Sequence, residues 1–194
     1  MTQVEKFYSG GQIALSIDEK SKSGFIYYPS GKVAVAISTA SSYQNAFYAY
    51  DNDKKGSLLL GLNERAVGFA TSSKQSSISS DLKRVSVVLT PTGGVLTDAK
   101  GTIIQEWAWN KKISTDNVLN DFLSVKLSDH IEINFKSKEE INLNFTYENV
   151  KHSVDMGFKV LRQKPSYLQK AKRLPGGHLL PMIDHLTLKK VYID

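Results

Sequence analysis

Short runs of β-branched and aromatic residues, separated by turn residues, extend through most of this 194-residue chain. The first clear pair of runs is residues 25–28 (FIYY) and 33–37 (VAVAI), which a Pro-Ser-Gly turn separates. The last run is residues 150–156. Turn signals at intervals of about 8–12 residues are typical of all-β folds. Connections this short cannot hold the crossovers that parallel strands need. The sequence therefore predicts an antiparallel β-meander, and both an open curved sheet and a partly closed barrel are compatible with it.

Residues 141–147 (INLNFTY) alternate strictly between apolar and polar side chains. Successive side chains of a strand point to opposite faces, so this period predicts a strand with one buried face. Trp107 and Trp109, two positions apart, would likewise share one face of a strand. Large aromatic side chains usually fill cores, so we interpret this pair as core rather than as a ligand platform.

Three segments differ in pattern. Residues 1–20 form an N-terminal preamble with one candidate strand at 12–17, residues 21–157 form the β domain, and residues 158–194 form a basic C-terminal arm. Ser166 and Gln169 have the spacing of a helix-capping box, and Pro175 follows soon after. We therefore predict a short helix near 166–173 within the arm.

Composition excludes several classes of site. The chain has no cysteine, which rules out disulfides, thiolate metal ligands and a cysteine nucleophile. Residues 1–20 lack the pattern of a secretory signal, and no run reaches the ~20 apolar residues of a membrane-spanning helix. We expect a cytoplasmic location.

The net charge of +6 is concentrated in one block. Residues 159–174 contain six of the 25 basic residues and no acidic one, which leaves 19 basic against 19 acidic residues elsewhere. A local excess of this kind favours contact with an anionic surface. The predicted partner-binding residues are Lys159, Arg162, Lys164, Lys170, Lys172 and Arg173 for charge, with Tyr167 and Leu168 as apolar anchors.

Motifs that would indicate catalysis or metal binding are missing from the sequence. It contains no nucleophile elbow, phosphate-binding loop, dinucleotide fingerprint or HExxH motif, and its four histidines are scattered. Residues 51–56 begin like a calcium loop, but Lys55 and Leu62 stand where ligands should be, so we predict a hairpin turn. We expect no enzyme activity, no cofactor and no metal; an enzyme using scattered carboxylates and histidines is the weakest alternative.

Three stretches carry a resemblance to a known family. They are residues 24–38 (GFIYYPSGKVAVAIS), 90–109 (TPTGGVLTDAKGTIIQEWAW) and 118–127 (VLNDFLSVKL). Together they resemble the C-terminal domain of the glutamate-rich protein 6 family, the "family with sequence similarity 194" domain, over about residues 20–157. The tyrosine–glycine hairpin also resembles MORN-like repeats. The basic arm lies outside the resembling span.

The resemblance implies an all-β, non-enzymatic domain of ciliated and flagellated cells. We therefore expect a structural or interaction protein of the axoneme, part of a larger complex, whose β domain and arm dock on a microtubule-associated assembly. Acidic tubulin or axonemal surfaces would suit the basic arm. The alternative is a peripheral membrane module that binds anionic lipid or phosphoinositide through the same arm. Nucleic acid is not an expected partner, because the neutral β domain offers no basic groove.

Overall fold

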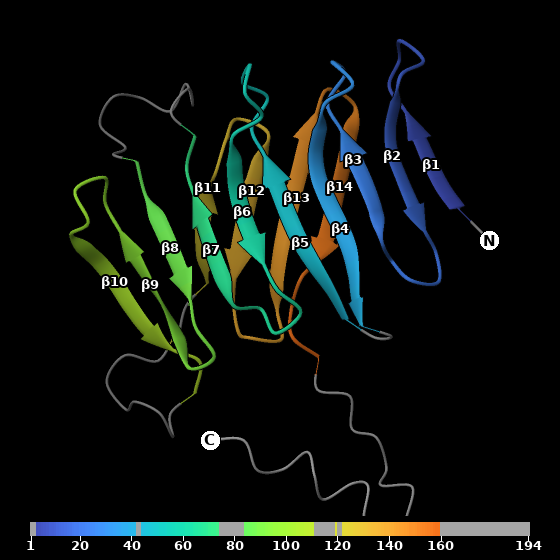
Figure 1. Cartoon of the computed structure of the whole chain (residues 1–194). Helices are drawn as coiled ribbons and strands as arrows, with labels where there is room; N and C mark the ends of the chain where they lie inside the picture. The colour runs from blue at the N-terminus through green and yellow to red at the C-terminus, as the bar shows by residue number, and fades with distance from the viewer. Residues whose placement is uncertain (1–2, 42–43, 74–83, 111–118, 120–121, 160–194) are drawn as a thin grey trace, which may run out of the picture. The chain divides into compact units, whose positions relative to one another are not determined.

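The structure is a computed structural model that describes residues 3–41, 44–73, 84–110, 119 and 122–159. This part of the chain is all-β, with fourteen strands and antiparallel pairing throughout (Figure 1). The strands are β1 (Gln3–Phe7), β2 (Ile13–Asp18), β3 (Gly24–Tyr27), β4 (Val33–Ser41), β5 (Gln44–Tyr50), β6 (Leu58–Leu62), β7 (Gly68–Thr71), β8 (Ser86–Leu89), β9 (Gly93–Thr97), β10 (Ile103–Ala108), β11 (Leu123–Lys126), β12 (Ile131–Phe135), β13 (Ile141–Tyr147) and β14 (Val150–Asp155). The predicted antiparallel meander is confirmed.

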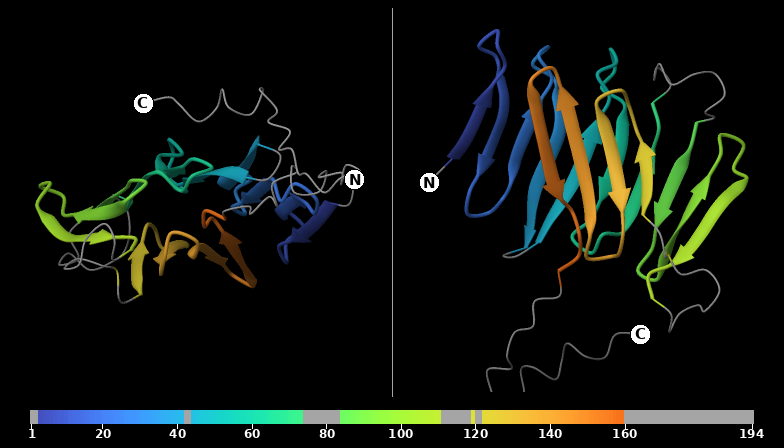
Figure 2. Two further views of the ribbon diagram at one scale, coloured as in Figure 1. Left: turned by 90° about the horizontal axis from the view of Figure 1, so that it is seen from below. Right: turned by 180° about the vertical axis from the view of Figure 1, so that it is seen from behind.

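The strands form two sheets. Strands β1 to β10 pair in chain order in one sheet, here called the long sheet, and β11 to β14 pair in chain order in the short sheet. Neither sheet closes on itself among the described residues, so the meander is open rather than a barrel. The short sheet lies across the middle of one face of the long sheet (Figure 2). We call that face of the long sheet its inner face, and the opposite face its outer face.

One type of turn recurs along the long sheet. The backbone carbonyl of Tyr28 accepts a hydrogen bond from Gly31 N at 2.9 Å, and the backbone N–H of Tyr28 donates to Lys32 O at 2.8 Å. Gly31 has φ of 80°, the left-handed conformation that ends a three-residue hairpin loop in a bulge. The same pair of backbone bonds is found at Tyr8, Asn63 and Asp98. Such tight turns keep consecutive strands adjacent, which produces the chain-order meander.

Side chains from both sheets share one core. Tyr28 is fully buried, with its ring 5.7 Å from that of Phe145 and its hydroxyl donating to Tyr50 O at 2.9 Å. The apolar side chains of β13 at positions 141, 143 and 145 are fully buried, as the alternation predicts. Burial of this continuous layer holds the short sheet on the inner face of the long one.

Trp107 is 3% exposed, so the prediction that it belongs to the core is confirmed. Trp109 lies just past the end of β10 and not on the strand as expected; it is partly buried, packs edge-on against Trp107 and donates its indole N–H to Thr90 O at 3.1 Å. The Gly93–Gly94 pair begins β9. Gly94 lies opposite Trp107 in the ladder, and a Cβ on Gly94 would lie 2.2 Å from the indole ring. The glycine is therefore required by the tryptophan that faces it.

The long sheet begins earlier than the sequence suggests. The candidate strand at 12–17 is confirmed as β2, and β1 precedes it in the same sheet, where Leu15 pairs with Ile26 of β3. Residues 3–18, expected as a preamble, thus contribute two of the ten strands. The arm from 160 onward, with the helix predicted near 166–173, lies outside the described residues. The ranges that are described contain no helix of the length and apolarity needed to cross a membrane.

Candidate interaction surfaces

A single row of side chains crosses the outer face of the long sheet. Its members are directly opposite one another in each successive ladder. From β1 to β10 they are Glu5, Ser16, Phe25, Ala36, Tyr48, Gly61, Phe69, Val88, Val95 and Glu106. Phe25 is 44%, Phe69 40% and Val88 52% exposed. Large residues alternate with small ones in its middle, and the Phe69 ring lies against Gly61.

The outer face is also free of charge over most of its width. Strands β3 to β9 contain no Asp, Glu, Lys or Arg. Charged residues lie in the connecting turns, for example Lys32 and Asp53, and at the two ends of the row. An antiparallel sheet with one solvated face normally alternates apolar with polar or charged residues. The outer face of the long sheet departs from that pattern.

The short sheet provides the contrast within the same molecule. Its outward positions include Lys126 opposite Glu132, and Thr146 opposite Lys151. Asp155 lies at the end of β14 and is exposed. This is the ordinary composition of a solvated sheet face, so the uncharged outer face of the long sheet is a specific feature rather than a property of the whole domain.

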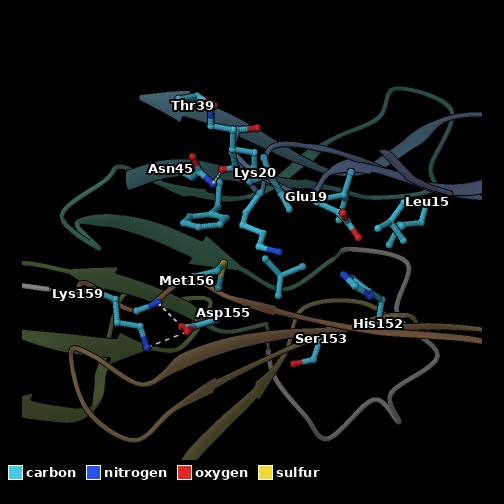
Figure 3. A pocket seen from close by; sticks show the side chains of 18 of the residues that line it. Leu15, Glu19, Lys20, Thr39, Asn45, His152, Ser153, Asp155, Met156 and Lys159 are labelled. Atoms are coloured by element: carbon cyan, nitrogen blue, oxygen red, sulfur yellow. Dashed lines mark hydrogen bonds and ion pairs between the residues drawn. The ribbon is translucent and has the colours of Figure 1, made fainter. Parts of the chain in front are cut away.

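A groove of about 710 Å³ lies between the two sheets at the side of β14. Figure 3 shows Leu15 and Asn45 on one side of this space and Ser153 and Met156 on the other. Its apolar lining includes Leu15, Ile17, Ile37 and Phe47 from the long sheet, and Val154 and Met156 from the β14 segment. Charged side chains of both signs, such as Lys20 and Glu64, also line it.

His152 of β14 also lines the groove. Burial, together with the positive charge of Lys6 in β1, lowers the pKa of His152 below its ordinary value of 6.5. The folded protein therefore disfavours the protonated ring, whereas the unfolded chain takes up the proton near the ordinary pKa. The contribution of His152 to stability is complete above about pH 6.5 and is lost as the pH falls below it.

We expect His152→Gln to reduce the loss of thermal stability that accompanies acidification below about pH 6.5. Glutamine keeps a polar side chain of similar reach but does not take up a proton there. The measurement is the melting temperature of both proteins on either side of that pH. The other three histidines are present in both proteins, so their contributions cancel in the comparison. An identical loss in the two proteins would contradict the assignment.

Of the eight predicted partner-binding residues, only Lys159 lies among those that the structure describes. Its ammonium group is 2.8 Å from Oδ2 of Asp155 and donates to Glu139 O at 3.2 Å. Its charge is thus compensated within its own domain, which leaves less of it for a partner. The other seven (Arg162, Lys164, Tyr167, Leu168, Lys170, Lys172 and Arg173) fall outside the described residues, and their roles stay predictions.

The remaining candidates for chemistry have structural roles. Residues 51–56 form the predicted hairpin connection, in which the Asp53 carboxylate accepts hydrogen bonds from Ser57 N and Oγ. His130 has its Nδ1 3.2 Å from Thr146 O and its ring 4.3 Å from that of Tyr147. Within the described ranges, no cluster of three or more His, Asp or Glu side chains is placed to hold a metal ion.

The comparison with known families matches residues 1–190 to the model of the FAM194 protein family. This chain belongs to the FAM194 family. The match is longer than the span of about 20–157 over which the sequence motifs resemble the family, and it includes both β1–β2 and most of the arm. The segment that holds the basic arm of this FAM194 protein therefore lies within the family match up to residue 190, contrary to expectation. The MORN-like character stays a prediction, and no solved structure matches the chain.

Sequence reasoning missed both surfaces of this FAM194 protein. A signal for the outer face was present, because every run from 24 to 71 that became a strand lacks charged residues. Strands that are buried on both faces also lack charged residues. The absence of charge therefore indicates an interaction surface only when one face of the sheet is known to be uncovered. No pattern in the sequence indicates the groove, since its lining comes from segments as distant as Leu15 and Met156.

Proposed function

We propose that this FAM194 protein is a non-enzymatic structural protein of the ciliary or flagellar axoneme. Its β domain and C-terminal arm dock on a microtubule-associated assembly. The observation that carries the docking role is the uncharged outer face of the long sheet, crossed by the row from Phe25 to Val95. The axonemal setting rests on the family resemblance.

An uncharged face is suited to burial against a protein because removing its side chains from water costs little free energy of desolvation. Moving a charged group out of water is costly unless it is paired. Each Å² of apolar surface buried contributes about 25 cal/mol. The centres of protein interfaces are depleted in charge and enriched in aromatic residues, and large exposed apolar patches mark such sites. Phe25, Tyr48 and Phe69 give the outer face that composition.

The arm supplies the charged part of the proposal. Its lysines and arginines complement acidic surfaces and would speed association with them. The membrane alternative relies on the arm alone, because strands β3 to β9 carry no lysine or arginine to pair with anionic headgroups. The outer face thus favours a protein partner over a lipid surface.

The test is co-sedimentation with demembranated axonemes. We expect Val88→Glu, which places a charge at an exposed position within the uncharged part of the outer face, to weaken binding by about tenfold or more, the effect of removing one strong interface residue. The matched control is Thr146→Glu, the same charge at an exposed position on the outer face of the short sheet. Equal loss in both variants would mean that added charge, and not the outer face, decides binding.

A chain ended after Gly157 separates the arm from the β domain in the same assay. We expect it to keep the sensitivity to Val88→Glu but to bind microtubules less well than the full chain. Equal sedimentation of the two forms with microtubules would contradict a role for the arm. Flotation of the full chain with phosphoinositide-containing liposomes, together with no binding to axonemes, would favour the membrane alternative.

A further inference from the structure

Among the described residues, strand β14 (Val150–Asp155) is the outermost strand of the short sheet on the side of the groove. Met156 N donates to Ile141 O at 2.8 Å, which fixes the hydrogen-bond pattern with β13. Bonded and non-bonded pairs alternate along an antiparallel ladder. Because Met156 is bonded to β13, the residues two, four and six positions before it, 154, 152 and 150, also direct their backbone N–H and C=O groups to β13. Lys151, Ser153 and Asp155 direct theirs to the open edge.

The open edge lies beside a part of the long sheet that the short sheet does not cover. The long sheet continues past β14 through β2 and β1 (Figure 2). Leu15 and Ile17 of β2 and Val4 of β1 line the groove there, together with Val154 of β14. The groove is thus bounded by inward apolar side chains and, along one border, by backbone donors and acceptors in the spacing of a strand.

We propose that the β14 edge binds an extended segment of a partner protein, which adds to the short sheet as a fifth strand. The backbone N–H and C=O groups along the edge can form hydrogen bonds with those of another extended segment. Every second side chain of the added strand would then enter the groove. The segment has apolar residues at every second position and a length of about five or six residues, matching β14. This inference deepens the proposed docking function and rests on it.

The facing edge, β1, is less suited to the same pairing. Lys6 is in register with the inward-facing Leu15, so it directs a charged side chain toward the inner face from an edge strand. The ladder also shifts register between Lys6 and Phe7. Inward charges and bulges are devices that discourage edge pairing. Strand β14, in contrast, keeps an unbroken register of six pairs with β13.

The experiment measures binding of a synthetic peptide to the full chain by fluorescence polarisation. The peptide has the sequence of β13, INLNFTY, flanked by lysines for solubility, because this sequence forms a strand in the protein and has apolar residues at every second position. We expect saturable binding with Kd below about 1 mM. A second peptide, with each apolar residue replaced by threonine, should bind at least about tenfold more weakly because the groove contributes apolar burial.

Two proline variants locate the edge. Ser153→Pro removes a backbone donor that points out of the sheet, a position where proline is compatible with an edge strand, and should weaken binding by about tenfold or more. Asp18 N donates to Ser23 O, so Ser16, two positions earlier, directs its backbone groups to β3 and not to β1. Glu5 lies opposite Ser16 and therefore directs its N–H out of the sheet, so Glu5→Pro makes the equivalent change on β1 and should leave binding unchanged. Circular dichroism melting verifies that both variants fold.

Three results would overturn the inference: no binding at about 1 mM peptide, equal binding of the threonine peptide, or sensitivity to Glu5→Pro in place of Ser153→Pro. Each is distinct from failure of the proposed function. Val88 lies on the outer face of the long sheet, away from the groove, so the axoneme assay with Val88→Glu reports on docking whether or not β14 binds a strand.

Discussion

Trp107→Ala is expected to lower the free energy of unfolding by about 3–5 kcal/mol, the range for removing a buried tryptophan. The indole is 3% exposed, lies over Gly94 of β9 and has its ring centre 6.0 Å from that of Phe135 in the short sheet. Removing it leaves a cavity at the place where β10 meets the short sheet. Equilibrium urea denaturation of the full chain measures the change, and a loss below about 1 kcal/mol would contradict this packing.

The two glycines of β9 provide a matched test of the same contact. A Cβ on Gly94 would lie 2.2 Å from the Trp107 ring, whereas a Cβ on Gly93 would lie 2.0 Å from the Trp107 backbone oxygen. Each alanine variant should cost about 1–3 kcal/mol by overpacking. In the Trp107→Ala background, Gly94→Ala should become nearly neutral while Gly93→Ala keeps its cost, because the carbonyl remains. Equal costs for Gly94→Ala in both backgrounds would disprove the ring contact.

Phe145→Ala is the second substitution with a large expected effect, again about 3–5 kcal/mol in the free energy of unfolding. Phe145 is fully buried and packs against Tyr28 of the long sheet at 5.7 Å between ring centres. The control is Thr146→Ala, one residue further along β13 on the solvated face, which should change stability by less than about 0.5 kcal/mol. Denaturation curves with similar losses for the two would mean that β13 has no buried face.

Coupling between Tyr28 and Phe145 tests whether the two sheets fold as one unit. The residues lie on different sheets, so a double substitution should cost less than the sum of the single ones by about 0.5–1.5 kcal/mol, the contribution of an aromatic pair. Additive costs would show that the rings do not contact one another. Tyr28 also donates to Tyr50 O, so leucine rather than alanine at 28 gives a comparison closer in volume.

The faces of the two sheets differ in what covers them and in their charge. The inner face of the long sheet is used by the short sheet and, beyond β14, borders the groove. The outer face is uncharged and carries Phe25, Tyr48 and Phe69, whereas the exposed face of the short sheet carries Lys126 and Glu132. Under the proposed function, one partner would bind the outer face of the long sheet and a second segment would bind the β14 edge.

Much of the strand pattern was readable because local sequence decides it. Alternation in residues 141–147, the turn residues after Tyr28 and the hairpin at Asp53 all act over a few positions, and each was confirmed. The sequence alone does not assign the glycine pair at 93–94 to a turn or to a strand, because glycine has two uses: it permits unusual turns, and it makes room for a large neighbour. Only the position of Trp107 across the ladder distinguishes the second use from the first.

The all-β class, the antiparallel order of the strands and the family could be recognised from side-chain period, short connections and motifs. The division of the strands into two sheets, and the choice of the face that the described residues leave uncovered, depended on packing in three dimensions. Charge-free strands are compatible with burial on either face, so their composition does not say which face meets water. Packing of Phe145 and Phe135 against the inner face made that choice and left the row from Phe25 to Val88 exposed.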